Sequence, residues 1–183
     1  MPTPVGHIIA GAIIYQAQQK EKNIWFLTFL LFFAMLPDCD FIFGFLVGDP
    51  NRYHHQFTHS FVFVVSAGLF GGLIYSKWQR TNFTLSSAFF VCAGITHVIL
   101  DLLAVDKREP FGCPIWWPFS NKFAISPVLI FSDVSRVSDS RLFFKSLFNA
   151  HNMRTITLEL FILMPIALII LWITRIKQGN TEQ

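Results

Sequence analysis

Charged side chains are scarce in this sequence. Only 14% of its 183 residues are Asp, Glu, Lys or Arg, whereas a soluble globular domain contains about 25%. The net charge of +3 is small and spread along the chain. The sequence therefore has no basic stripe of the kind that a nucleic-acid-binding surface needs. This composition argues against an ordinary soluble domain and against a nucleic-acid-binding protein.

Cysteine is scarce too. Cys39, Cys92 and Cys113 form no CxxC pair and leave one cysteine over, so neither a disulfide framework nor a thiolate zinc site is indicated. The apolar stretch at 5–15 has no basic region before it and no clear small-residue cleavage site after it. We therefore interpret this stretch as a helix of the mature protein rather than as a signal peptide.

Apolar residues, by contrast, are abundant: 53% of the chain is hydrophobic, and Phe alone occurs 22 times. This composition is typical of an integral membrane protein, and the length allows one domain over residues 1–183. The fold class we predict is an all-α, polytopic membrane helical bundle with four to five apolar helices. The helices are expected at about 5–18, 24–36, 60–76, 83–105 and 156–174.

One long region, 106–155, separates the last two predicted helices. Four of the nine prolines lie between positions 110 and 127, so a regular helix is not expected there. A short amphipathic helix on the membrane surface is expected at 141–150.

The apolar run 83–105 contains two ionisable side chains, His97 and Asp101. Their spacing of four places them on one face of a helix. A carboxylate at the centre of a bilayer costs about 2.5–3.5 kcal/mol on insertion scales, so such residues are functional candidates by default. Two interpretations stay open for this pair: it holds a metal ion, or it is a hydrogen-bonded pair that locks two helices together.

Polar residues from distant parts of the chain are expected at one end of the bundle. If the five helices alternate in direction, the end that holds the N-terminus also receives every candidate ligand. The candidates are His7, Asp38, Asp40, His54, His55, His59, His97 and Asp101. Imidazole and carboxylate without thiolate suit zinc, manganese, iron or nickel. A metal with open coordination positions activates water for attack on an ester or phosphoester.

Structural interpretations of the same residues remain open. His7 could be a helix-start residue, and Asp38 and Asp40 could be turn residues at a helix end. His54 and His55 could be solvated loop residues or groups that orient metal ligands.

Five short blocks give the chain a resemblance to a known family. They are Gly6-His7-Ile8-Ile9, Leu36-Pro37-Asp38-Cys39-Asp40, Thr58-His59-Ser60, His97-x3-Asp101 and the run from Gly112 to Ser120. In this order, over about residues 5–120, they resemble the membrane-bound metal-dependent hydrolases, also called the LexA-binding, inner-membrane-associated hydrolase family. The resemblance implies a helical protein of the bacterial inner (plasma) membrane with a metal centre.

That family is similar, more distantly, to the zinc-dependent phospholipase C and single-strand nuclease group. By position, this similarity implies zinc as the cofactor and five ligands: His7, Asp38, His59, His97 and Asp101. Asp40 would be a further ligand or the base that orients the attacking water. His55 joins Asp40 as a candidate catalytic residue.

The chain departs from the family pattern in two places. The family usually has His-Arg-Gly-x-Thr-His-Ser, whereas this chain has His54-His55-Gln56-Phe57-Thr58-His59-Ser60. The arginine that could clamp a phosphate is therefore absent, which weakens a phosphoester assignment. In the family a Thr follows soon after the Asp of the His-x3-Asp motif, and a Gly-x-Pro block comes close behind. In this chain Ala104 and the charged segment 106–109 follow Asp101 instead. One or two metal ions are expected rather than three.

Three functions are compatible with these patterns. The first is a metal-dependent hydrolase that acts at the membrane surface on a lipid or another phosphoester, with the bilayer as its setting. The second is a non-enzymatic membrane protein whose metal or polar cluster is structural. The third is a small transporter with a His/Asp relay, which we rank last because the polar residues gather at one end. The sequence predicts no oligomeric state.

Basic residues also bear on orientation. Short segments at the end opposite the candidate ligands carry Lys20, Lys22, Lys77, Arg80, Arg175 and Lys177. By the positive-inside rule that end is expected to be cytoplasmic, so the candidate site would face outward.

Overall fold

The computed structural model describes residues 1–18 and 23–179, and these ranges contain helices and irregular segments but no strand. Lys20 and Lys22, which entered the orientation argument, lie outside the described residues. The elements are α1 (Pro4–Ala17), α2 (Ile24–Met35), η1 (Leu36–Cys39), α3 (Asp40–Leu46), η2 (Phe57–His59), α4 (Phe61–Gln79), α5 (Phe83–Leu102), α6 (Phe143–Leu147) and α7 (Ala150–Gly179). The predicted all-α class is confirmed.

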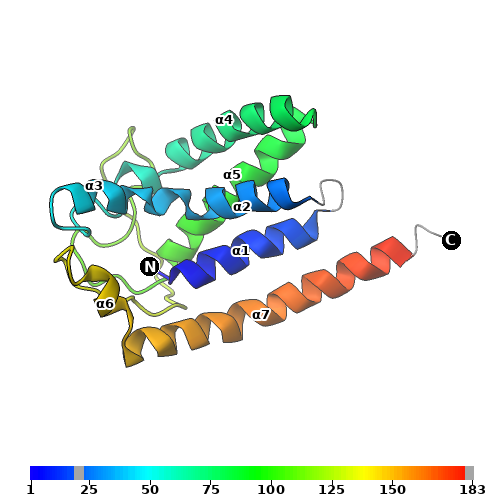
Figure 1. Ribbon diagram of the computed structural model, residues 1–183. Helices are drawn as coiled ribbons and strands as arrows, with labels where there is room; N and C mark the ends of the chain where they lie inside the picture. The colour runs from blue at the N-terminus through cyan, green and yellow to red at the C-terminus, as the bar shows by residue number, and fades with distance from the viewer. Residues whose placement is uncertain (19–22, 180–183) are drawn as a thin grey trace.

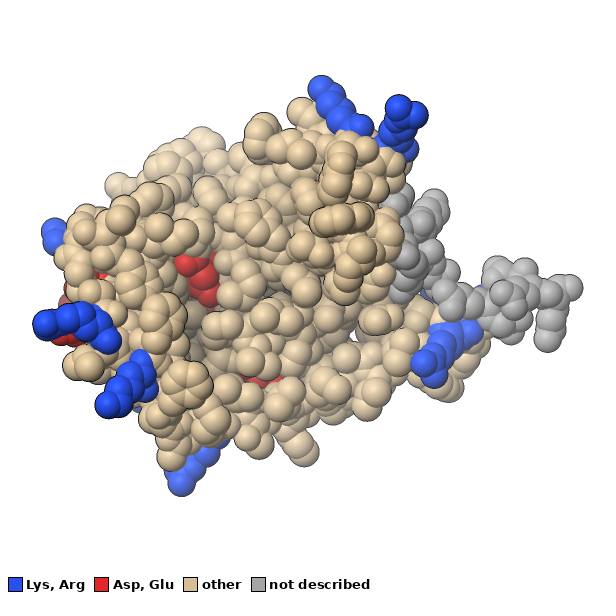
Figure 2. All heavy atoms as spheres, viewed as in Figure 1, with Lys and Arg blue, Asp and Glu red and all other residues tan. Residues whose placement is uncertain are grey.

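The long helices lie side by side and alternate in direction (Figure 1). Four segments are long and apolar enough to cross a membrane: Ile24–Leu46, Phe61–Gln79, Phe83–Leu102 and Ala150–Lys177. Helix α1 is a shorter apolar helix. Lys and Arg side chains gather at the two ends of the molecule, and a broad belt between them carries none on the face shown in Figure 2. This distribution is the one expected for a polytopic membrane bundle.

The second predicted helix, 24–36, was too short, because helical structure continues beyond Pro37. A 3-10 turn, η1, follows α2 directly, and α3 begins at Asp40. Pro37 lies in the first turn of η1, where it needs no backbone donor. The combined segment of 23 residues is long enough to span the membrane.

The last predicted helix, 156–174, was also too short. Helix α7 begins at Ala150 because Asn149 caps it: the Asn149 Oδ1 atom accepts a hydrogen bond of 2.9 Å from the backbone N–H of Asn152. Pro165 lies inside this helix without ending it. The irregular region consequently runs over 103–149, and the surface helix expected at 141–150 is reduced to α6.

Three other helix starts are fixed by capping side chains in the polar turns. Asn23, Ser60 and Asn82 each accept a hydrogen bond from the backbone N–H three residues further on. These caps lie between apolar runs, so the observed starts of α2, α4 and α5 agree with the predicted ones within a residue.

Helices α4 and α5 form a closely packed hairpin. A Cβ atom added to Gly72 would lie 2.6 Å from the Cα atom of Ser87, and one added to Gly68 would lie 2.6 Å from the backbone nitrogen of Val91. Small residues permit this approach in lipid, where close packing drives helix association. The hairpin brings the end of α5, with its His and Asp, beside the segment that precedes α4.

Candidate metal centre

The eight candidate ligands lie together at one end of the bundle. His7 comes from the first turn of α1, the two aspartates from η1 and the start of α3, three histidines from the segment that ends in η2, and the last pair from α5. In Figure 1 the N-terminus, α3, the start of α4 and the end of α5 share this end. The predicted convergence is therefore present in the structure.

Four donor atoms form the centre of the cluster. The Nε2 atoms of His59 and His97 lie 3.3 Å apart, and Asp101 Oδ2 lies 3.3 Å from the first and 3.1 Å from the second. Asp38 Oδ1 lies 3.7 Å and 3.6 Å from the same two nitrogens. Tetrahedral zinc with ligands at 2.0–2.1 Å separates those ligands by about 3.4 Å. Both carboxylate oxygens thus lie from the two histidine nitrogens at about the spacing of tetrahedral ligands.

His7 lies on the other side of Asp101. Its Nε2 atom is 3.5 Å from Asp101 Oδ1, and its ring stacks on the ring of His97 with centroids 3.8 Å apart. Donor atoms of His7, Asp38 and His97 all lie within 4.8 Å of one another. Asp101 therefore presents one oxygen to His59 and His97 and the other oxygen to His7.

Asp40 contacts the Nδ1 atom of His59, on the side of the ring away from the four central donor atoms. Its Oδ2 atom is 3.3 Å from His59 Nδ1 and accepts hydrogen bonds from the backbone N–H of His55 and from Thr58 Oγ1. Its Oδ1 atom is 3.0 Å from His54 Nδ1. A carboxylate on the far nitrogen of a metal-binding histidine fixes the tautomer and the orientation of the ring. This arrangement favours an orienting role for Asp40 over direct ligation.

His97 is oriented by a backbone carbonyl. Its Nδ1 atom donates a hydrogen bond of 2.7 Å to the oxygen of Ala34. Ala34 lies in the last turn of α2, where carbonyl groups lack partners within the helix. In the neutral ring the Nε2 atom, which points to Asp101, therefore carries the lone pair.

Several buried polar atoms of the cluster have no hydrogen-bond partner among residues 1–18 and 23–179. They are both ring nitrogens of His7, Asp38 Oδ1, His55 Nε2 and both carboxylate oxygens of Asp101. Burying charged groups without partners is costly. The cluster contains three carboxylates, those of Asp38, Asp40 and Asp101, and a cation would balance their negative charge. The residues present thus fit a divalent cation.

The sequence did not single out two neighbours of His55. Asp106 Oδ2 lies 3.3 Å from His55 Nδ1 and accepts a hydrogen bond from the backbone N–H of Gly112. Burial alone would raise the pKa of Asp106, but the bonds from His55 and from backbone N–H groups hold it below its ordinary value. Cys113 also lies near His55 and Asp101, and burial raises the pKa of its thiol to about 12. The position of Asp106 soon after the α5 motif was the signal available in the sequence.

The comparison with protein families gives one match, to the YdjM inner membrane protein family, over residues 1–179. The chain belongs to this family. Together with its four spanning helices, this membership makes it an integral protein of the inner membrane. Neither the comparison with curated proteins nor the comparison with solved structures found a match. The YdjM match extends well beyond the five motif blocks and covers α7.

One buried contact attaches α7 of this YdjM-family protein to the site. Glu159, for which the sequence suggested no role, is fully buried within α7. Its Oε1 atom accepts a hydrogen bond of 2.6 Å from the backbone N–H of Thr3, and its Oε2 atom accepts one from the Thr3 hydroxyl. Thr3 immediately precedes α1. The contact therefore fixes the first turn of α1, which carries His7.

Proposed function

We propose that this YdjM-family protein is a metal-dependent hydrolase that acts on an ester or phosphoester at the membrane surface. The observation that carries the proposal is the convergence of four donor atoms from η1, η2 and α5. The Nε2 atoms of His59 and His97 lie 3.3 Å apart, and the Asp38 and Asp101 oxygens each lie 3.1 to 3.7 Å from both nitrogens. Chain segments far apart in the sequence converge there. The Nδ1 atoms of the two histidines face acceptors that orient the rings, His59 the Asp40 carboxylate and His97 the Ala34 carbonyl.

The cation would be held by Asp38, His59, His97 and Asp101, and His7 with the second Asp101 oxygen offers a further position. This set of nitrogen and oxygen donors favours zinc, with manganese and iron as alternatives. A bound divalent cation supplies a Lewis acid that lowers the pKa of water and polarises the scissile group.

His55 is suited to accept a proton from a water molecule beside the cation site. Its Nδ1 atom faces Asp106, and its unpartnered Nε2 atom lies 3.8 Å from Asp101 Oδ2. Burial lowers the pKa of His55, against the opposing effect of Asp106, so the ring is neutral near pH 7. A neutral imidazole whose Nδ1–H donates to a carboxylate presents a basic Nε2, as in other histidine bases.

The test combines metal analysis with hydrolysis by the purified full-length protein. We expect stoichiometric metal and metal-dependent cleavage of at least one member of a panel of phosphoesters and carboxylic esters. His97→Ala and Asp101→Asn should lose both. His151→Ala is the matched control, because His151 lies outside the cluster and pairs with Asp133. Stoichiometric metal without turnover on the whole panel would contradict the proposal.

A structural cluster is the second candidate function. One observation favours it: the ligand candidates come from α1, η1, η2 and α5, so a bound cation would lock this end of the bundle. In that case Asp101→Asn would lower thermal stability and metal content together, with no activity to lose.

A further inference from the structure

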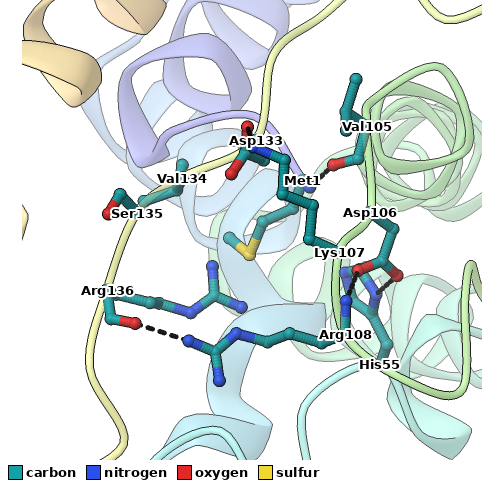
Figure 3. Close-up of a pocket in the computed structure, with 10 residues that line it drawn as sticks. All are labelled: Met1, His55, Val105, Asp106, Lys107, Arg108, Asp133, Val134, Ser135 and Arg136. Carbon is teal, nitrogen blue, oxygen red and sulfur yellow. Dashed lines mark hydrogen bonds and ion pairs between the residues drawn. The ribbon is translucent and has the colours of Figure 1, made fainter.

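A cavity of about 340 Å³ opens beside the metal centre. Its walls come from the segment after α5 and from residues 133–136 of the long irregular region, and His55 lies in its wall (Figure 3). The side chains of Arg108 and Arg136 extend into it and bring their guanidinium groups close to each other. A cationic space thus adjoins the candidate base.

Neither arginine has a carboxylate partner within 4.0 Å in the part of the chain that the structure describes. Arg136 Nε donates to Asn51 Oδ1, and Arg108 donates to the backbone oxygen of Arg136 and to Ser138 Oγ. Lys107, by contrast, pairs with Asp133 at 2.9 Å. The two guanidinium groups therefore retain N–H donors and positive charge for a ligand.

Burial and a second arginine weaken the preference of Arg136 for its charged form, and a bound anion would restore it. Burial and the nearby Arg108 lower the pKa of Arg136 to about 10. Its guanidinium lies over the ring of Phe41, 5.1 Å from the centroid, a contact that holds the charged group in place. Two adjacent guanidinium groups are the arrangement that binds a phosphate, because each presents paired N–H donors.

An apolar cleft of about 300 Å³ continues from the same cavity. The two spaces share Met1, Val134 and Arg136 in their walls. The cleft is lined further by aromatic and aliphatic side chains of α3, α6 and their neighbours, and Asp38 of the metal centre lies in its wall. The cationic cavity and the apolar cleft therefore meet at Arg136, and both border the metal centre.

We infer that these two spaces bind one lipid that carries a phosphate group. Arg108 and Arg136 bind the phosphate, and the cleft takes the apolar chain. The inference that this lipid is the substrate rests on the proposed hydrolase function. A lipid fits better than a soluble phosphate, because the anion site continues into an apolar space in a protein that lies in the membrane. The arginine missing from positions 54–60 is thus replaced by arginines from a different segment.

The test measures binding to the full-length protein in detergent, with probes that a hydrolase cannot cleave. The probes are a phosphonate analogue of a dihexyl-ether glycerol phosphate, dihexyl-ether glycerol itself and inorganic phosphate. A charged hydrogen bond contributes about 1.5–3 kcal/mol, so we expect the phosphonate lipid to bind about tenfold or more tightly than either other probe. Equal affinity for the phosphonate lipid and the neutral lipid, or for the phosphonate lipid and inorganic phosphate, would overturn the inference.

Substitutions separate the two halves of the site. Arg108→Gln, at an exposed position, should weaken binding of the phosphonate lipid about tenfold and leave the neutral lipid unchanged. Arg136→Gln should act in the same way. Arg141→Gln is the matched control, since Arg141 is exposed and pairs with Asp139 outside the cavity. Unchanged phosphonate binding in Arg108→Gln would overturn the anion site.

The cleft has its own pair of variants. Phe144→Ser should weaken both lipid probes but not inorganic phosphate, whereas Phe148→Ser, at an exposed position that does not line the cleft, should weaken neither. Turnover without phosphonate-lipid binding would overturn this inference alone. Arginine-dependent binding in a protein that hydrolyses nothing would support the lipid site and overturn only the proposed hydrolase.

Discussion

The Nε2 atoms of His59 and His97 face each other at 3.3 Å, although the two residues are 38 positions apart. The Nδ1 atom of His97 donates to a backbone carbonyl, and that of His59 lies against Asp40 and Thr58. In neutral rings both Nε2 atoms therefore carry lone pairs. Two lone pairs at this distance repel each other unless a proton or a cation lies between them, and Asp101 and Asp38 supply the negative charge that favours a cation.

Metal removal should consequently lower the thermal stability of the protein. A ligand present at 100 times its dissociation constant stabilises the folded state by about 2.7 kcal/mol, which corresponds to a shift in Tm of about 5–11 °C for a chain of this size. We expect a chelator to lower the Tm measured by nanoscale fluorimetry, and zinc to restore it. His97→Ala should abolish this response, whereas His151→Ala should retain it. A Tm that is indifferent to chelator in protein shown to contain metal would contradict the prediction.

Asp40→Asn tests the orienting role of Asp40. The amide has one accepting oxygen, so it cannot accept both from the partners of Oδ2, which are Thr58, the backbone of His55 and the ring of His59, and from His54 at Oδ1. Loss of such an orienting partner lowers metal affinity about 10- to 100-fold. Competition with a fluorescent zinc chelator measures this affinity. Asp49→Asn is a suitable control, because the Asp49 side chain accepts only a local hydrogen bond from the backbone N–H of Asn51 among the described residues. An unchanged affinity in Asp40→Asn would contradict the orienting role.

The helices and the gathering of ligands at one end could be predicted from the sequence. Apolar runs separated by capped polar turns define α1, α4 and α5, and alternating helix directions then place His7, His59 and Asp101 at the same end. The continuation past Pro37 could not be predicted in this way, because a proline in an apolar run indicates a helix end unless a 3-10 turn follows.

The contributions of the irregular region 103–149 to the site could not be predicted from the sequence either. Asp106, Cys113 and Arg136 reach the site through tertiary folding of a segment without hydrophobic periodicity. Its backbone is held by isolated bridges between distant positions, Ala104 with Phe131 and Cys113 with Ala124. Pairings between such distant positions have no local signal, so neither the Asp106 contact nor the arginine pair was predicted.

Glu159→Ala should destabilise the protein strongly although Glu159 lies far from the metal centre in sequence. The substitution leaves the buried backbone N–H and hydroxyl of Thr3 without their acceptor, and an unsatisfied buried donor costs about 1–3 kcal/mol. Denaturation in SDS measures the loss. Thr157→Val, which removes only an exposed hydroxyl bonded within α7, is the control. A double-mutant cycle with Thr3→Val should show coupling, and additive effects would contradict the contact.

The distribution of basic residues predicts on which side of the membrane the metal centre lies. The end opposite the metal centre carries Lys77 in the last turn of α4, Arg80 between α4 and α5, and Arg175 and Lys177 near the end of α7. Most basic residues at the other end lie in one long region, which weighs less in the positive-inside rule. We therefore expect a cytoplasmic C-terminus: a C-terminal green fluorescent protein fusion should fluoresce, and a C-terminal alkaline phosphatase fusion should be inactive.

Asn121→Cys, at an exposed position on the metal-centre side, should react with a membrane-impermeant maleimide in intact spheroplasts above the level of the parent chain. This result would place the phosphate-binding cavity at the outer leaflet, where only lipids that have crossed or been delivered to that leaflet can enter it. An active phosphatase fusion together with an unlabelled Asn121→Cys chain would reverse the assignment.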